Sequence, residues 1–267
     1  DGTGTIVTVP NEPKRIVPIA ASTEDIVLSL VDPNRVAAVG TVPNNVPDAS
    51  AKVEKHVKAS AESMLSVQPD LVLVPNWMSP DAIGEMRNMQ IPVYVYKTPT
   101  TVEEAKATIH EIAGLLHASD ESMIASMNAD LKTVEELANK YSGERPLVAF
   151  YSQFGLTGGK GSTFDDMCKY LKVNNAAAQV GLGPFDNGMR EDLIKSNPDI
   201  IFIPSVAYTS DGTTPATVEQ LYSDPALQGV KAISNRRVFL VDSSQVMSYS
   251  QFMTRAMVSM AQNIYSM

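Results

Sequence analysis

A repeated pattern places two glutamates, Glu62 and Glu191, at equivalent positions of the chain. Residues 62–75 read ESMLSVQPDLVLVP and residues 191–204 read EDLIKSNPDIIFIP. Each copy predicts a short helix that ends before the first proline, followed by a strand buried on both faces. An acidic residue is favoured in the first turn of any helix. The matched carboxylates also suit docking onto basic sockets of a pseudo-symmetric partner.

Residues typical of catalytic and metal sites are few. The three histidines, His56, His110 and His117, are dispersed, and the single Cys168 cannot form a multi-thiolate site. The chain contains neither a G-x-S-x-G nor an H-E-x-x-H motif. The sequence therefore predicts no catalytic residues, no metal site formed by the protein and no resident cofactor.

A glycine-rich segment, GLTGGKGS at residues 155–162, resembles a phosphate-binding loop. It is one residue short, and Gly161 stands where such loops need Ser or Thr to hold magnesium. We therefore reject nucleotide hydrolysis. Backbone amides and Lys160 can still meet an anionic group of a ligand, and the alternative is a simple tight loop.

Aromatic, sulfur-containing and polar side chains follow several of the predicted strands. A large flat ligand needs apolar faces and a few polar groups that orient it. For each candidate, the alternative is that the side chain packs inward. The candidate ligand-binding residues are Ser22, Thr23, Asn44, Trp77, Met78, Phe154, Lys160, Phe185, Arg190, Tyr208, Met247 and Tyr249.

Alternating strands and helices must position these residues. Apolar runs predict strands at 15–20, 35–39, 71–74 and 93–96, and again at 147–151, 200–203 and 238–241. Helices are predicted between them, which indicates parallel sheets with helices on both faces. Ligands of such sheets gather at the carboxyl ends of the strands, where most of the candidates fall.

One long helix is predicted at residues 119–141, with apolar residues at three- and four-residue steps and no Gly or Pro. It would be roughly 34 Å long. We expect it to join two similar lobes whose ligand-binding loops face each other across a cleft. The predicted domains are an N-terminal lobe at 1–118, an interlobe helix at 119–142 and a C-terminal lobe at 143–267.

Composition excludes several classes of protein. The 267 residues carry a net charge of −9, and no run of Lys or Arg suits nucleic acid or an anionic membrane. Apolar runs are shorter than the ~20 residues of a membrane span. We expect a segment upstream of Asp1 to have been removed, so a missing signal peptide does not argue against export. Residues 1–13 are expected to form a flexible leader.

Five blocks of the sequence resemble the ABC-importer substrate-binding proteins for ferric siderophores, haem and cobalamin. The resemblance extends from Arg15 to Met267, and the blocks stand in the family's order. It implies a class III periplasmic-binding-protein fold: two α/β lobes, each a mostly parallel sheet flanked by helices, joined by one long helix. The blocks are residues 15–40, 60–74, 157–177, 189–205 and 221–242.

The same resemblance implies partners and location. The ligand would be a small-molecule metal chelate, delivered to the transmembrane subunits of an ABC permease. Glu62 and Glu191 match the positions that form salt bridges with permease arginines. The protein would be extracytoplasmic, periplasmic or lipid-anchored, and monomeric.

The ligand itself is less clearly indicated. The tyrosine that some haem-binding members carry shortly before the first docking glutamate has no counterpart here, where only His56 stands upstream. Tyr208, Met247 or Tyr249 could still serve as an axial ligand. Arg190 is the clearest candidate to meet an anionic siderophore. A neutral, aromatic and methionine-bearing cleft fits a corrinoid at least as well, so iron chelate and cobalamin rank nearly equal.

Two other classes of function remain open. One is an enzyme on the same bilobed scaffold, such as a metal chelatase, which would need converging acid-base or metal ligands. The other is a sensor or scavenger that binds the same solute without a permease.

Overall fold

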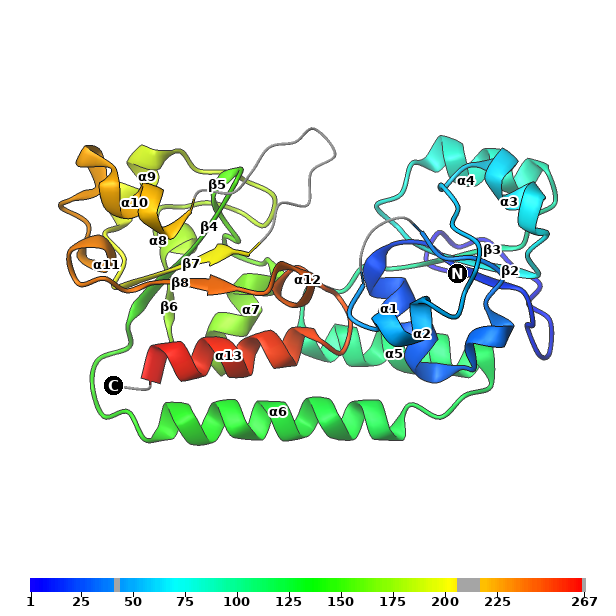
Figure 1. Cartoon of the computed structure of the whole chain (residues 1–267), viewed down its shortest axis with the longest axis horizontal. Coiled ribbons are helices and arrows are strands. Elements are labelled where there is room, and N and C mark those ends of the chain that lie inside the picture. Colours follow the sequence, from blue (N-terminus) through cyan, green and yellow to red (C-terminus); the bar gives the residue numbers. More distant parts are fainter. Residues whose placement is uncertain (41–43, 206–216, 266–267) are drawn as a thin grey trace. The chain divides into compact units, whose positions relative to one another are not determined.

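The computed structural model describes residues 1–40, 44–205 and 217–265, which form two compact units (Figure 1). Unit 1 comprises Asp1–Pro99, Glu103–Ser126 and Ser248–Phe252. Unit 2 comprises Thr100–Val102, Met127–Met247 and Met253–Met267. Tyr208 lies outside the described residues.

Unit 1 contains a parallel sheet of three strands in the order β1-β2-β3. The strands are β1 (Ile16–Pro18), β2 (Leu71–Pro75) and β3 (Val93–Tyr96), and β2 is buried along its whole length. The helices of this part of the chain are α1 (Ala21–Leu30), α2 (Pro47–Ser50), α3 (Ala61–Val67), α4 (Pro80–Asn88) and α5 (Val102–Leu116).

The strand expected at residues 35–39 is wrong. Pro33–Arg35 form a 3₁₀ turn, and the following residues make only single bridges, one from Val36 to Ile16 and one from Val39 to His56. This segment changes its hydrogen-bonding partner after two residues, so no continuous ladder forms. Its apolar side chains are nevertheless buried, which explains why the pattern resembles a strand.

Helices cover both faces of the unit 1 sheet. Val72 and Val74 pack into one core cluster with residues of α3 and α4. Neighbouring side chains of a strand point to opposite faces, so Leu71 and Leu73 face the other side, where α1 packs against β1 and β2. On that second side Tyr94 donates a hydrogen bond of 2.5 Å to Glu111 of α5.

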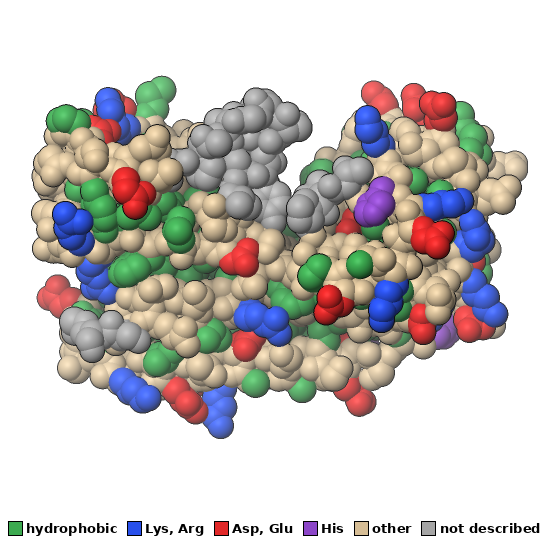
Figure 2. All heavy atoms as spheres, in the orientation of Figure 1, with side chains coloured by type: hydrophobic (Ala, Val, Ile, Leu, Met, Phe, Trp, Pro, Cys, Tyr) green, Lys and Arg blue, Asp and Glu red, His purple; other side chains and the backbone are tan. Residues whose placement is uncertain are grey.

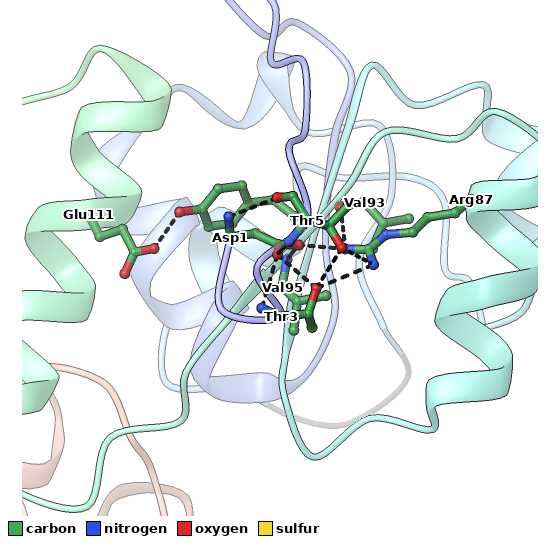
Figure 3. A network of polar contacts seen from close by, with 8 residues as sticks. Asp1, Thr3, Thr5, Arg87, Val93, Val95 and Glu111 are labelled. Atoms are coloured by element: carbon green, nitrogen blue, oxygen red, sulfur yellow. Dashed lines mark hydrogen bonds and ion pairs between the residues drawn. The ribbon is translucent and has the colours of Figure 1, made fainter.

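The start of the chain is held at the edge of this sheet (Figure 3). Gly2 N donates to Val95 O at 2.6 Å, and Val95 N donates to the Asp1 carboxylate at 3.2 Å. That carboxylate is fully buried and pairs with Arg87 at 2.5 Å. The expectation of a flexible leader is therefore wrong for residues 1–5, because the buried ion pair ties them to α4 and the hydrogen bonds of Val95 tie them to β3.

Unit 2 contains a second sheet in the order β5-β4-β7-β8, with β6 also paired to β4. All pairings are parallel except that of β4 with β5. The strands are β4 (Leu147–Ser152), β5 (Gly155–Thr157), β6 (Asn174–Asn175), β7 (Ile200–Pro204) and β8 (Val238–Val241). The helices are α7 (Thr163–Tyr170), α8 (Ala176–Gln179), α9 (Arg190–Ser196), α10 (Val218–Ser223), α11 (Lys231–Ser234), α12 (Ser243–Val246) and α13 (Met253–Tyr265).

Both faces of this sheet are buried as well. Ala149, Ile201 and Ile203 form a core with residues of α8, α9, α10 and α11. On the opposite face Phe150 stacks on Phe164 of α7, with ring centroids 5.5 Å apart, and α13 packs against β8. Burial of β2 and β7 on both faces is the environment that four consecutive apolar residues predict.

The long helix is α6 (Glu121–Asn139), which begins in unit 1 and ends in unit 2. Met123, Met127, Val134 and Ala138 are buried along its length, as the three- and four-residue spacing predicts. The predicted fold class is confirmed. The chain forms two units with mostly parallel, helix-flanked sheets, and one long helix runs from the first unit into the second.

The repeat corresponds to a duplicated structural module. Gln68 and Asn197 both adopt the left-handed conformation, with φ of 46° and 51°, and each ends its helix before the Pro-Asp pair. Asp70 N donates to Arg15 O, and Asp70 accepts from Arg15 N at 2.9 Å. Asp199 exchanges the same two hydrogen bonds with Leu147, at the start of the neighbouring strand. The aspartate thus ties the buried strand to its neighbour in both units.

Candidate ligand and docking sites

In unit 1 the candidates Ser22 and Thr23 begin α1, directly after β1. Both are buried, and Thr23 lies fully in the interior, donating to Ile19 O at 2.6 Å with its hydroxyl 2.7 Å from that of Tyr96. Burial raises the pKa of Tyr96 to about 12. Thr23 is therefore held in the interior of unit 1 by its own hydrogen bonds, and its contact with a ligand stays a prediction.

Tyr249 lies in the short segment of unit 1 that comes from the C-terminal part of the chain. It is half-buried, and this burial raises the pKa of its phenol. Tyr249 is thus a neutral, partly accessible hydroxyl at physiological pH, suited to hydrogen bonding.

Two buried carboxylates, Glu24 and Asp25, organise this edge of unit 1, and neither is among the site residues predicted from the sequence. Glu24 accepts from Gly40 N and from Asn44 Nδ2, both at 2.7 Å. The predicted ligand residue Asn44 is therefore engaged in holding its own loop. Asp25 accepts from Asn45 N at 2.6 Å and from its Nδ2 at 2.8 Å.

Asp25 also binds the segment Ser248–Phe252. The hydroxyls of Ser250 and Ser248 donate to its carboxylate at 3.1 and 3.4 Å, and Gln251 Nε2 donates to its backbone carbonyl at 3.0 Å. Burial raises the pKa of Asp25 to about 6 despite these hydrogen bonds, and burial also raises the pKa of Glu24. One buried carboxylate thus fixes a loop and a segment more than 200 residues away in sequence.

Trp77 and Met78 follow β2, and the structure separates them. Trp77 is 62% exposed, whereas Met78 is buried in the core cluster of the sheet. Of the two, only Trp77 is exposed enough to offer its side chain to a ligand. The contact of Met78 with a ligand stays a prediction.

In unit 2 the candidates Phe154 and Phe185 are 51% and 88% exposed. Leu156 and Gly188 exchange backbone hydrogen bonds of 3.0 and 2.8 Å, which joins the segments that carry the two phenylalanines. Gly155 makes this approach possible, because its φ is +94° and a Cβ there would lie 2.1 Å from Gly188 O. Both aromatic side chains are therefore accessible to a ligand.

The glycine-rich segment is a tight loop. Lys160 N donates to Leu182 O at 2.8 Å, Gly161 N to Asp165 at 2.9 Å and Ser162 N to Gly159 O at 3.1 Å. The amides expected to meet an anion are thus satisfied within the protein, and that expectation is wrong for them. The side chain of Lys160 is exposed and is the remaining candidate of this loop.

Arg190 pairs with Asp224 at 3.0 Å, so its charge is largely compensated. The pKa of Asp224 is lowered by the backbone hydrogen bond from Ala226 and by Arg190. Met247, which follows α12, is 38% exposed.

Metal ligands do not converge in the described parts of the chain, where no group of three His, Cys, Asp or Glu side chains could hold an ion. His56 Nδ1 lies 2.9 Å from Gly40 O, and His110 Nδ1 lies 3.1 Å from Asp120. Cys168 is buried, which raises the pKa of its thiol.

Glu62 and Glu191 each occupy the second position of a short helix, α3 and α9. Both are exposed, and neither makes a hydrogen bond or ion pair with a described residue. Helix α3 is capped by Ser60, whose hydroxyl accepts from Ser63 N, so its glutamate does not serve as the cap. Two unpartnered carboxylates on duplicated helices are available to a partner.

Comparison with known proteins agrees with this arrangement. A family described as periplasmic binding protein matches residues 16–245. An uncharacterized ABC transporter substrate-binding lipoprotein of Bacillus subtilis is 27% identical over 99% of this chain and 84% of its own length. A cobalamin-binding protein of Halobacterium salinarum is 24% identical, over 82% of this chain and 61% of its own length.

Among solved structures, the periplasmic haem-binding protein RhuT of Roseiflexus sp. RS-1 in its apo form has a TM-score of 0.78 to this chain. The alignment covers 95% of this chain and 98% of that protein at 20% identity, which establishes a shared fold. Within the described residues, no helix has both the length and the hydropathy to cross a bilayer. The family match extends over both sheets and both copies of the duplicated module. The chain therefore belongs to the periplasmic binding protein family.

Proposed function

We propose that this protein is the extracytoplasmic solute-binding component of an ABC importer, and that it captures a bulky metal chelate for delivery to the permease. The observation that carries the proposal is the family match over residues 16–245, which includes the two exposed, unpartnered glutamates. The relative in Bacillus subtilis is described as an ABC transporter substrate-binding lipoprotein, which supports a permease partner and a location outside the cytoplasmic membrane.

The ligand class is supported by the exposed aromatic side chains of each unit. Trp77 in unit 1 and Phe154 and Phe185 in unit 2 offer flat apolar surface of the kind that a macrocycle needs. Compensation of Arg190 by Asp224 disfavours a strongly anionic chelate. We therefore place cobalamin ahead of haem, which carries two propionates, and of anionic ferric siderophores, in keeping with the name of the cobalamin-binding relative.

The chelate, in this proposal, brings its metal and most of the metal's ligands with it. Ser22, Lys160, Arg190, Met247 and Tyr249 are the polar and sulfur-containing candidates that would orient it, with the neutral phenol of Tyr249 as a hydrogen-bond donor. The proposal includes no catalytic step. A metal chelatase would need acid-base groups at an accessible site, whereas Glu24 and Asp25 are buried and bound to their own loops.

We further propose that the protein acts as a monomer and does not bind nucleic acid. On the face drawn in Figure 2, acidic and basic side chains are interspersed over the described residues, without a broad basic patch. The net charge of −9 also disfavours a polyanionic partner. The alternative function, a sensor or scavenger without a permease, would use the same ligand site. It differs from the proposed function only in that Glu62 and Glu191 would bind no partner.

Fluorescence of Trp77 tests the ligand proposal directly, because this is the only tryptophan of the chain. Titration with cobalamin or haemin is expected to quench this fluorescence saturably, since both chelates absorb light that an excited indole emits. Trp77→Ala is expected to weaken binding about tenfold, as loss of an aromatic contact does. That affinity is measured from the visible spectrum of the chelate.

The matched control is Met89→Ala, which truncates another exposed apolar residue of unit 1, 50% exposed. It should bind as the wild type does. Equal affinity of the Trp77→Ala protein and the wild type would remove Trp77 from the ligand site.

A further inference from the structure

The duplicated helices share more than their glutamates. Residues 62–67 and 191–196 have the same order of exposed, half-buried and buried positions. Met64 and Leu193 are buried apolar residues at equivalent positions, and each packs into the core of its own unit, as Val67 also does in unit 1. The next residue in each copy, Leu65 or Ile194, is apolar but points outward, with 50% and 39% of its surface exposed.

We propose that Leu65 and Ile194 are the apolar anchors of the surface that docks onto the permease, one in each unit. This inference rests on the proposed function. A single exposed aliphatic residue needs no explanation, but exposure at equivalent positions of both modules is a shared feature. Met64 and Leu193 already supply the core contacts of these helices, so neither Leu65 nor Ile194 is needed for folding.

The helix geometry joins each anchor to its glutamate. Leu65 follows Glu62 by three residues, and Ile194 follows Glu191 by three, so each pair lies on one side of its helix. A partner that binds one pair must present a cation beside an apolar depression. Because the pair occurs twice, the partner must present this socket twice, as two copies of one transmembrane subunit do.

The two members of a pair contribute differently to binding. Carboxylates at the rim of an interface steer the encounter and make the affinity depend on salt. Aliphatic side chains that lose water on docking contribute through burial, which salt screens little. The salt dependence of binding therefore separates the roles of glutamate and anchor.

The test uses the full-length protein and the permease of the same organism, reconstituted with its ATPase in nanodiscs. Leu65→Ser and Ile194→Ser are each expected to weaken binding about tenfold, and together about 100-fold, with an unchanged salt dependence. Glu62→Gln and Glu191→Gln should instead lower both the affinity and its salt dependence. Leu65→Ile and Ile194→Leu should retain affinity, because they keep the apolar surface.

Control variants are Met89→Ser in unit 1 and Leu240→Ser in unit 2, which remove exposed apolar residues of 50% and 55% exposure. Both should bind like the wild type. If the glutamate variants lose affinity and the serine variants at Leu65 and Ile194 do not, the anchor proposal fails and the proposed function stands. If the wild type does not bind the permease, both fail.

Discussion

Reversal of both exposed glutamates, in a Glu62→Lys/Glu191→Lys protein, is expected to abolish delivery to the permease while ligand capture persists. Each lysine would place a cation against a cationic socket, and like charges opposed across an interface cost several kcal/mol. The affinity for the nanodisc-bound permease should fall by more than about 100-fold. Both side chains are exposed and without a described partner, so the fold should tolerate the change.

The matched control for this variant is Glu54→Lys/Glu144→Lys. It changes the net charge by the same amount, one residue in each unit, at exposed positions outside the duplicated helices. The control should bind the permease with nearly the wild-type affinity. Any small change that it shows measures the effect of net charge alone and is subtracted from the result for the Glu62→Lys/Glu191→Lys protein. If the Glu62→Lys/Glu191→Lys protein supports ligand uptake at the wild-type rate, docking through these residues is excluded. A function as sensor or scavenger without a permease would then be favoured.

Loss of the buried carboxylate in Asp25→Ala is expected to lower the free energy of unfolding by about 3 kcal/mol. The substitution removes the acceptor of Asn45 N and of the serine pair, in which Ser248 and Ser250 keep only the hydrogen bond between their own hydroxyls. Buried donors without partners cost roughly 1–3 kcal/mol each. Chemical denaturation measures the loss, and hydrogen exchange should show faster exchange of amides in residues 248–252.

The control is Asp48→Ala, at an exposed aspartate in the first turn of α2. It should cost less than about 1 kcal/mol, the value of a helix-dipole contact. Unchanged stability of Asp25→Ala, together with unchanged exchange in residues 248–252, would show that Asp25 does not hold this segment.

The same residue predicts a pH dependence of stability. The pKa of Asp25 is raised to about 6 in the folded protein from an ordinary 3.8, so the folded state binds its proton more tightly than the unfolded state. Burial of the ionised carboxylate lowers the free energy of unfolding. This loss is absent below pH 3.8, where the carboxyl is protonated in both states, and complete above pH 6. Wild type should therefore gain about 1 kcal/mol relative to Asp25→Asn between pH 7 and pH 5. The pKa of Glu24 is also raised, partly by the charge of Asp25, so it is raised less in Asp25→Asn, and this adds to the difference in the same direction.

The sheets and the duplication could be predicted because the repeated segments carry local signals. Four apolar residues after a Pro-Asp pair specify a strand buried on both faces, and β2 and β7 have that environment. Residues 35–39 carry a similar apolar run but change partner after two residues. Whether a buried extended segment joins a ladder depends on neighbours that the segment itself does not specify.

The ligand surface was harder to predict because adjacent residues of one turn can face opposite ways. Trp77 is exposed and Met78 is buried, although both follow the same strand. The acidic residues Glu24 and Asp25 have the composition of a helix start, and their partners are distant in sequence. The signal that could have identified them is the pairing of two adjacent acids with two adjacent amides, Asn44 and Asn45, in the next loop.

Thermal unfolding in the presence of cobalamin, haemin and ferric siderophores tests the central claim most directly. A ligand that binds only the folded protein, at 100 times its dissociation constant, should add roughly 2.7 kcal/mol to the free energy of unfolding. The account predicts a shift of this size with at least one of these chelates, and a larger shift at higher concentration. No shift with any of them at saturating concentration would contradict it.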